Sequence, residues 1–330
     1  MPTGHLGDLT TAALHYLHLS LAPSSLATYR SGWSSYSNFC SSHRFPTLPL
    51  SEATLLLFCT SLASRNVTHG TIKVYLYALT YFSRLSGHAF SVDLFPRLQF
   101  LLRGVRRSQG NTLTRPLRSP ITLTHLRSLH TFIFRHFADQ SIRSLRARTV
   151  LCSGRQSLPH FFGLLRASEF TAPSSSSFLP STLLYHHVSF SFSPNVAHLF
   201  LPSSKTDQFA SGADIKLFRQ SPPVCPFSAT LAFHTVHPFR TGPFFRFCSG
   251  DYLTRSAFVA LLRSVFPSQS SLNSHSFRIG GASALAAAGI PDFEIRILGR
   301  WSSDSFLRYI RLRPSSLRDH QSRMRHAPSL

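Results

Sequence analysis

The sequence predicts a mainly α-helical protein of two domains, with one small antiparallel β-sheet in the second. Apolar residues recur three or four positions apart through residues 23–107, which is the period of an amphipathic helix. Three short runs between residues 183 and 218 are alternating or rich in β-branched and aromatic residues, as strands are. Helical spacing returns from Thr254. We therefore expect an all-α domain followed by an α+β domain.

The first domain is expected over residues 21–107, after an N-terminal segment of residues 1–20. Four runs with helical spacing are separated by turn residues: ATYRSGWSSYSNFCSSH, EATLLLFCTSLASR, TIKVYLYALTYFSRLSG and DLFPRLQFLLRGVRRS. Four short helices in this length make a small all-α domain. Short polar residues or a glycine stand where the first three helices begin and can cap them: Ser24 or Ser25, Ser51, and Thr68 or Gly70.

Residues 108–120 are expected to link the domains, because this stretch holds two prolines and few large apolar residues. The second domain, residues 121–330, opens on the amphipathic helical run ITLTHLRSLHTFIFRHF. Three runs then predict the strands of an antiparallel sheet: LLYHHVSFSF, NVAHLFLP and ADIKLF. The pattern becomes helical again, and Gly289 with Pro291 ends one helix before Asp292 caps the next.

The charge of the chain favours a polyanionic partner. The formal net charge is +22 with only 12 acidic residues among 330, so a positive field covers most of the surface. Nucleic acid is the obvious candidate. Most of the cationic charge is arginine, whose planar guanidinium suits contacts with phosphate and guanine, although GC-rich coding sequence would give the same bias. The only lysines are Lys73, Lys205 and Lys216.

Several classes of protein are disfavoured by the sequence. The five cysteines stand far apart without a CxxC pair, which suggests neither a disulfide framework nor a zinc finger. The most apolar early run, residues 53–63, is too short for a bilayer, which needs about 20 residues, and the N-terminus lacks the pattern of a signal peptide. We therefore expect an intracellular protein with no membrane partner, nuclear if its source is eukaryotic.

The last third of the chain carries the side chains needed to cut a phosphodiester. His275, Arg278, Trp301 and Tyr309 lie in the run NSHSFRIGGASALAAAGIPDFEIRILGRWSSDSFLRYIR. A tyrosine phenol can attack phosphorus and keep the bond energy in a phosphotyrosine ester. Arginine forks stabilise the charge that develops on the phosphorane oxygens, and a lysine or histidine can protonate the leaving oxygen. This chemistry requires no metal ion or other cofactor.

The order and spacing of five short motifs resemble the tyrosine recombinase, or phage integrase, family. The motifs are FFGLLRASEF, SSKTDQF, HSFR, GRWSS and FLRYIR. The resemblance covers nearly the whole chain and looks closest to the recombinases of eukaryotic mobile elements of the Crypton and DIRS type. It implies a helical core-binding domain of the SAM-like type followed by an α+β catalytic domain. It also implies double-stranded DNA as the partner, a homo-tetramer on paired DNA sites, and no small-molecule substrate.

The same resemblance implies a role for each motif residue. Arg166 and Arg278 would hold the scissile phosphate, and Tyr309 would be the nucleophile. Lys205, at the tip of a β-hairpin, would be the general acid. Glu169, one helical turn after Arg166, would orient that arginine.

Two further residues would support the reaction. His275 would assist proton transfer or phosphate binding, and Trp301 would donate its indole N–H at the position that many members fill with histidine. Ordinary structural interpretations stand beside these roles. Trp301 would commonly pack in a core or interface, and Tyr309 would face that core from an amphipathic helix.

Local patterns around these residues make physical sense. Either serine of residues 302–303 can cap a short helix that bears Tyr309. Gly280 and Gly281 would let the following helix pack closely against its neighbours. Arg278 would then lie at the N-terminal end of that helix, where the helix dipole adds to phosphate binding.

One stretch departs from the family pattern. Residues 151–160, LCSGRQSLPH, hold Gly154 and Pro159 where an apolar helix should lead into Arg166. Two compensating frame changes or a mispredicted exon would explain this, and a comparison of the transcript with the genomic reading frame would test that hypothesis.

Three alternatives to an active recombinase remain open. A catalytically inactive DNA-binding protein derived from such an enzyme is favoured by the altered stretch at residues 151–160. A type IB topoisomerase shares the tyrosine chemistry but works as a monomer. A basic structural protein of chromatin would form no covalent bond through Tyr309.

Overall fold

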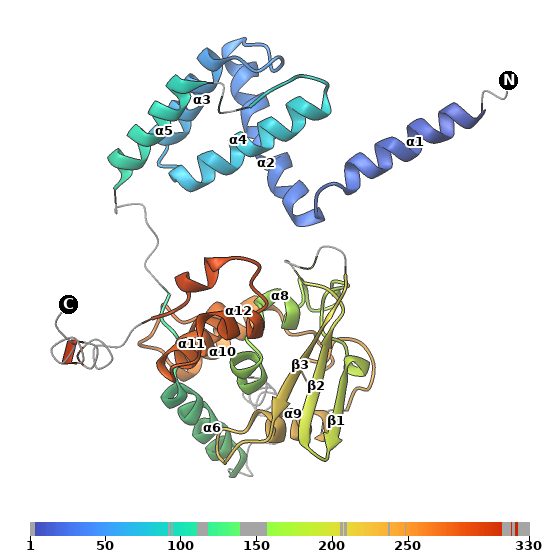
Figure 1. The fold of residues 1–330 in the computed structure, drawn as a ribbon, viewed down its shortest axis with the longest axis vertical. Coiled ribbons are helices and arrows are strands. Elements are labelled where there is room, and N and C mark those ends of the chain that lie inside the picture. Colours follow the sequence, from blue (N-terminus) through green and yellow to red (C-terminus); the bar gives the residue numbers. More distant parts are fainter. Residues whose placement is uncertain are drawn as a thin grey trace, which may run out of the picture. The chain divides into compact units, whose positions relative to one another are not determined.

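The computed structural model describes residues 4–91, 93, 95–110, 118–138, 157–204, 207, 210–236, 238–247, 249–311, 318 and 321–322. The chain divides into two compact units, Met1–Arg115 and Pro116–Leu330. Figure 1 shows a helical first unit and a second unit that combines helices with a sheet. The predicted fold class, mainly α with one small antiparallel sheet, is confirmed. None of the described helices is long and apolar enough to cross a membrane.

The first unit contains five described helices. They are α1 (Gly4–Leu19), α2 (Pro23–His43), α3 (Glu52–Ser64), α4 (His69–Leu85) and α5 (Pro96–Gln109). The last four are the helices that the sequence predicts. The first, α1, occupies the N-terminal segment, for which the sequence predicts no helix, and α5 reaches two residues into the expected linker.

The starts of these helices show which capping predictions hold. Ser51 and Thr68 each cap a helix, because each hydroxyl accepts a hydrogen bond from the backbone N–H three residues later. The predicted caps of α2, Ser24 and Ser25, are wrong. That helix begins at Pro23, a residue without an N–H group, so its first position has no N–H to satisfy.

The core of the first unit forms where α2 crosses α4 and α3 packs against both. A Cβ atom added at Gly32 would lie 3.0 Å from the Ala78 Cβ and 3.2 Å from the Tyr75 Cα, so the two helices approach at a glycine. The rings of Tyr36 and Phe58, both fully buried, meet edge to face with centroids 5.2 Å apart. The remaining large side chains of this core include Leu55, Leu62, Ile72, Leu76, Leu79 and Leu98.

The second unit arranges helices beside a three-stranded sheet (Figure 1). Its described helices are α6 (Leu123–Ala138), α8 (Ala167–Phe170), α9 (Pro226–Val236), α10 (Arg255–Val265), α11 (His275–Ala287) and α12 (Asp292–Leu298). Residues 157–162 are also helical, and two 3₁₀ turns are η2 (Tyr185–His187) and η3 (Asp304–Arg308). The strands are β1 (Val188–Phe192), β2 (Asn195–Leu201) and β3 (Ala213–Phe218).

The sheet has the order β1-β2-β3, and both pairs are antiparallel, as predicted. His198 of β2 faces Ser189 on one side and Lys216 on the other. The first strand begins at Val188, because the preceding residues form η2. Helix α9 packs against β2 and β3, and burial of alternate residues of β3 gives the sheet one inner face.

The first half of helix α11 is buried, and two of its glycines let neighbouring residues come close. A Cβ atom on Gly280 would lie 1.8 Å from the Ile121 oxygen, and one on Gly281 would lie 2.4 Å from the Leu164 Cδ2. The Ile121 N–H donates to the Ser276 oxygen at 2.9 Å. The close packing expected of these glycines is confirmed, and it holds α11 against the residues around Leu164.

The end of α11 and the start of α12 differ slightly from expectation. Gly289, with φ of 78°, follows the end of α11 in the left-handed conformation that glycine adopts without strain. Pro291 is the N-cap of α12, and Asp292 is its first helical residue. The predicted cap at Asp292 is therefore wrong by one position, although its charge still lies at the positive end of the helix.

The stretch that departs from the family pattern enters the core. Residues 151–156 lie outside the described residues, but residues 157–160 are helical and buried. The His160 ring stacks on Phe170 with centroids 3.5 Å apart, and Phe245 and Phe258 meet it edge on. Neither ring nitrogen of His160 has a hydrogen-bond partner among the described residues. Burial lowers the pKa of His160 well below its ordinary value, so the core holds a neutral and unsatisfied imidazole.

Candidate catalytic site and nucleic-acid interface

Two arginines share one buried carboxylate in the second unit. Arg166, at the N-cap of α8, donates from Nη1 to Glu169 Oε1 at 3.0 Å and from its backbone N–H to Oε2 at 2.8 Å. Arg300, just after α12, donates from Nη2 to Glu169 Oε2 at 2.8 Å. Only 1% of the Glu169 side chain is exposed, compared with 14% for each arginine. The carboxylate is thus fixed, and it fixes both guanidinium groups.

A third arginine is held by backbone carbonyls. Arg278, fully buried on α11, donates to the oxygens of Leu164 and Gly299. Its guanidinium carbon lies 4.0 Å from the centre of the Trp301 ring. A Cβ atom at Gly299 would overlap that ring at 1.5 Å, so the indole can cover the guanidinium only because residue 299 is glycine.

Tyr309 lies against this group of side chains. Its ring centroid is 4.9 Å from that of His275, 5.2 Å from that of Trp301 and 5.8 Å from the Arg278 guanidinium carbon. Ser303 caps η3, and Tyr309 directly follows this turn. The capping serine is as predicted, but the element is a 3₁₀ turn that ends before the tyrosine.

One hydroxyl anchors the backbone on both sides of the tyrosine. Ser283 of α11 donates its hydroxyl to the Tyr309 oxygen at 3.1 Å and accepts from the Arg311 N–H at 2.9 Å. Since α11 also carries His275 and Arg278, the tyrosine and the groups around it share one rigid support.

The arginine cluster, by which we mean Arg166, Arg278 and Arg300 together with Glu169, carries an excess of positive charge. Burial, with Arg166 and Arg300 nearby, lowers the pKa of Arg278 to about 9, and burial also lowers the pKa of Arg300. At neutral pH Arg278 remains charged. Three guanidinium groups and one carboxylate leave two positive charges, so the cluster is suited to bind an anion.

His275 is neutral at physiological pH. Burial is the largest cause, and the arginines around it, Arg118 first among them, lower its pKa further, to about 4. A neutral imidazole has one nitrogen that accepts a proton and one that donates a hydrogen bond. His275 can therefore take a proton from a phenol or donate a hydrogen bond to a phosphate, and a bound anion would raise its pKa.

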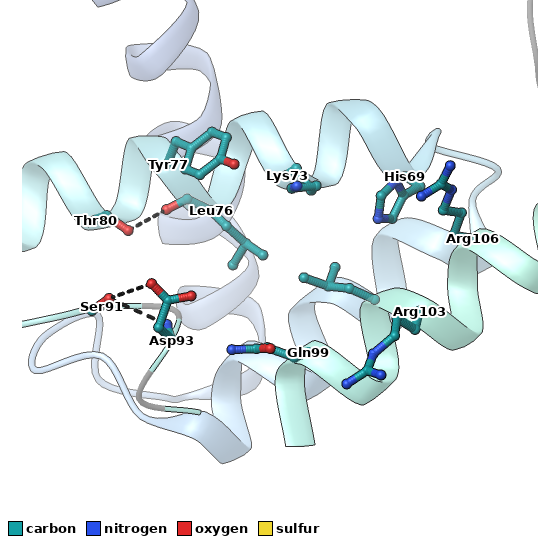
Figure 2. A pocket seen from close by; sticks show the side chains of 11 residues that line it. His69, Lys73, Leu76, Tyr77, Thr80, Ser91, Asp93, Gln99, Arg103 and Arg106 are labelled. Carbon is teal, nitrogen blue, oxygen red and sulfur yellow. Dashed lines mark hydrogen bonds between the residues drawn. The ribbon is translucent and has the colours of Figure 1, made fainter. Parts of the chain in front are cut away.

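A groove of about 440 Å³ runs between α4 and α5 of the first unit. Figure 2 shows His69, Lys73, Arg103 and Arg106 toward one end of it, with Ser91 and Asp93 toward the other. Lys73, Arg103 and Arg106 are exposed. Burial, together with Lys73 and Arg106, lowers the pKa of His69. This α4–α5 groove offers exposed cations of the kind that bind phosphate oxygens.

No protein-family model matches the chain, and no curated protein matches it. Solved structures do match. The Tn1549 transposon integrase in complex with transposon right end DNA has a TM-score of 0.56 at 13% identity, covering 93% of this chain and 95% of that one. A lambda integrase dimer bound to a COC′ core site has a TM-score of 0.54 at 12% identity, with coverages of 92% and 96%. XerH site-specific recombinase bound to a palindromic difH substrate has a TM-score of 0.51 at 12% identity, with coverages of 84% and 70%.

This chain has the tyrosine recombinase fold. Within that fold, the second unit brings together six of the residues singled out from the sequence: Arg166, Glu169, His275, Arg278, Trp301 and Tyr309. Lys205 lies outside the described residues, in the connection between the antiparallel strands β2 and β3. Among the described residues, no group of three or more His, Cys, Asp or Glu side chains is placed to hold a metal ion.

The recombinase fold also places Arg300 in the cluster, and sequence reasoning missed it. The residue stands inside the GRWSS motif, beside Trp301, so the motif contained the signal. Two features could have drawn attention to it: a basic residue between a glycine and a tryptophan, and a position where the chain turns out of a helix. Its φ of 56° is the left-handed conformation, which the surrounding hydrogen bonds maintain.

Proposed function

We propose that the protein cleaves and rejoins DNA strands at specific sites through a 3′-phosphotyrosine intermediate. The observation that carries this proposal is the position of Tyr309, within 5.8 Å of the Arg278 guanidinium and beside the His275 ring, in a tyrosine recombinase fold. A phenol next to a preformed cationic cluster is the arrangement that attack on a phosphodiester needs.

The reaction would proceed by in-line displacement. The Tyr309 oxygen attacks phosphorus, the bond from phosphorus to the 5′ oxygen breaks, and the phenol proton passes to His275 or to water. Lys205 would protonate the leaving 5′ oxygen, which gives a free 5′ hydroxyl. Attack by the 5′ hydroxyl of another strand reverses these steps and completes strand exchange.

The arginines would hold the phosphate throughout. Arg166, oriented by Glu169, and Arg278, oriented by two carbonyls, are fixed before DNA arrives. Because Arg278 is fully buried, direct contact between it and the phosphate would require a neighbouring side chain to move. Trp301 covers the Arg278 guanidinium and excludes water from one face of it. An indole N–H bond to the phosphate would be an additional role for Trp301.

Double-stranded DNA is the proposed substrate. The net charge of +22 supports sequence-independent attraction, and the α4–α5 groove would bind the sugar–phosphate backbone with Lys73, Arg103 and Arg106. The first unit would thus act as a core-binding domain that clamps DNA together with the second unit. A homo-tetramer on paired sites, a mobile element of the Crypton or DIRS type, and action in a eukaryotic nucleus complete the proposal.

A catalytically inactive DNA-binding protein is the second candidate. The observation in its favour is His160, an unsatisfied imidazole in the core, which comes from the stretch that departs from the family pattern. This candidate keeps the cationic groove and the arginine cluster but forms no covalent intermediate.

A suicide-substrate assay separates the two candidates. Nicked DNA from the ends of the source element is incubated with wild type, Tyr309→Phe or Tyr252→Phe and run on a denaturing gel. A covalent protein–DNA band with wild type and Tyr252→Phe, absent with Tyr309→Phe, establishes the nucleophile. DNA binding by mobility shift without a band from any protein would establish the inactive candidate.

A further inference from the structure

Arg300 makes several hydrogen bonds within the arginine cluster, although the sequence motifs imply no role for it. Its guanidinium donates to Glu169 Oε2 at 2.8 Å, to the Gly163 oxygen at 3.2 Å and to the Leu164 oxygen at 3.3 Å. In return, its backbone oxygen accepts a hydrogen bond of 3.0 Å from Arg166 Nη2. Arg166 is therefore held at one side by the Arg300 backbone and at the other by a carboxylate that the Arg300 side chain holds.

The same side chain fixes the turn that leads into Arg166. Leu164 has a φ of 48°, an uncommon conformation for a leucine, and its oxygen accepts from both Arg278 and Arg300. Arg300 thus hydrogen-bonds both to the turn at residues 163–164 and to the carboxylate that orients Arg166. The residue before it, Gly299, accepts a hydrogen bond from Arg278.

We propose that Arg300 is a positioning residue for Arg166 and also sets the charge of the cluster, an inference that rests on the proposed function. With Arg300 present, Glu169 is shared, and two positive charges remain for the DNA phosphate. Without it, Glu169 would neutralise Arg166 alone, and the cluster would keep one positive charge.

This charge difference acts mainly in the transition state. A phosphodiester in the ground state carries one negative charge, whereas the pentacoordinate phosphorus formed by tyrosine attack carries about two. Two positive charges in the cluster therefore match the transition state better than the bound substrate. An interaction that is stronger in the transition state than in the ground state raises the rate of cleavage more than the affinity for DNA.

The test separates rate from affinity. Arg300→Met and Arg300→Lys are compared with wild type and with Arg263→Met, which removes the same charge from an exposed site on α10. The single-turnover rate of covalent adduct formation is measured on saturating nicked DNA, and the dissociation constant is measured in the Tyr309→Phe background. We expect Arg300→Met to lower the rate by about 10²-fold, the range for loss of one preorganised donor, with little change in affinity.

Two further variants separate charge from geometry. Arg300→Lys keeps the charge but lacks the fork that reaches three acceptors, so its rate should lie between those of wild type and Arg300→Met. The double variant Arg300→Met/Glu169→Gln restores two positive charges but removes the carboxylate that orients Arg166. Cleavage faster than that of Arg300→Met would assign the loss to charge, and slower cleavage would assign it to the position of Arg166. A parallel loss of rate and affinity in Arg300→Met, or a loss no larger than that of Arg263→Met, would overturn the proposal.

Failure of the proposed function gives a different result. If wild type itself forms no adduct, recombination is refuted, and thermal unfolding of the same proteins then tests the positioning role alone. The hydrogen bond between Arg300 and Glu169 requires that the effects of Arg300→Met and Glu169→Gln be non-additive. Additive losses of stability would overturn the positioning role independently of any reaction.

Discussion

In the α4–α5 groove, Lys73, Arg103 and Arg106 stand in water, whereas Arg278 of the second unit is fully buried and held by two carbonyls. Both regions are cationic and both are suited to phosphate. Exposed cations attract a polyanion whatever its sequence, and salt screens this attraction. The buried cations are oriented before the ligand arrives. Under the proposed function, the exposed cations would supply affinity for DNA and the buried ones would fix the geometry of the site.

The largest expected effect comes from removing the central buried cation. Arg278→Met should abolish adduct formation and lower the free energy of unfolding by about 3 kcal/mol, because the oxygens of Leu164 and Gly299 lose a buried donor. Urea unfolding of the full chain measures this, with Arg263→Met as the exposed control. If both variants unfold at the same urea concentration, Arg278 does not stabilise these carbonyls.

The second prediction concerns the imidazole that the core leaves unsatisfied. His160→Phe should raise the free energy of unfolding by about 1–2 kcal/mol, because it replaces an unpartnered imidazole by a ring suited to its aromatic neighbours. The gain should grow as pH falls below 6.5, since the unfolded histidine then binds a proton that the folded one, with its lowered pKa, does not. Urea titrations at pH 7.5 and 5.5 would show this, and a loss of stability at both would contradict it.

The third prediction addresses the groove. Replacing Lys73, Arg103 and Arg106 together by alanine should weaken DNA binding and leave the stability of the protein nearly unchanged. The slope of log affinity against log salt should become shallower by about 0.9 for each phosphate that these side chains neutralise in wild type. Fluorescence anisotropy of labelled duplex in the Tyr309→Phe background gives both quantities. Arg30→Ala, at an exposed position of α2, is the control. If this variant changes the salt slope as much as the groove variant does, the groove does not contribute specifically to DNA binding.

The last prediction concerns acid sensitivity. The folded pKa of His275, about 4, lies below its ordinary value of 6.5, so stability should fall as pH drops from 6.5 toward 4 while the unfolded chain takes up the proton. His275→Asn should make the stability less dependent on pH across this window. Thermal melts of the two proteins between pH 7 and 4 test this. If their melting temperatures change in parallel with pH, the pKa of His275 is not lowered in the folded protein.

The sequence predicts those parts of the fold that have a regular pattern of apolar residues. The four helices α2 to α5 follow from the spacing of their apolar residues, and the three strands follow from alternation and from their β-branched and aromatic residues. The start of α2 and the cap of α12 were misjudged, because several residues near a helix end are chemically able to cap it. The element before Tyr309, η3, is a 3₁₀ turn, which spacing does not distinguish from an α-helix.

The site was predictable in its parts but less so in its assembly. The motif residues were singled out by their chemistry, yet their convergence depends on close approaches such as that of Gly281 to Leu164, which no local pattern encodes. Arg300 escaped notice because arginine is common throughout the chain, so a further one attracts no attention. The burial of His160 was equally hidden, since a histidine in a broken helical pattern is typical of a surface loop.

The hydrogen bonds of the arginine cluster join parts of the chain that lie far apart in the sequence and are therefore synthesised at different times. Arg278 reaches a carbonyl 114 residues earlier, and Arg300 reaches one 137 residues earlier. Contacts of such long sequence separation cannot form until both partners have been synthesised. A chain still emerging from the ribosome would therefore lack both the arginine cluster and the tyrosine, and truncated products would carry the cationic groove without either. Under the proposed function, unfinished copies of the protein would therefore not cut DNA.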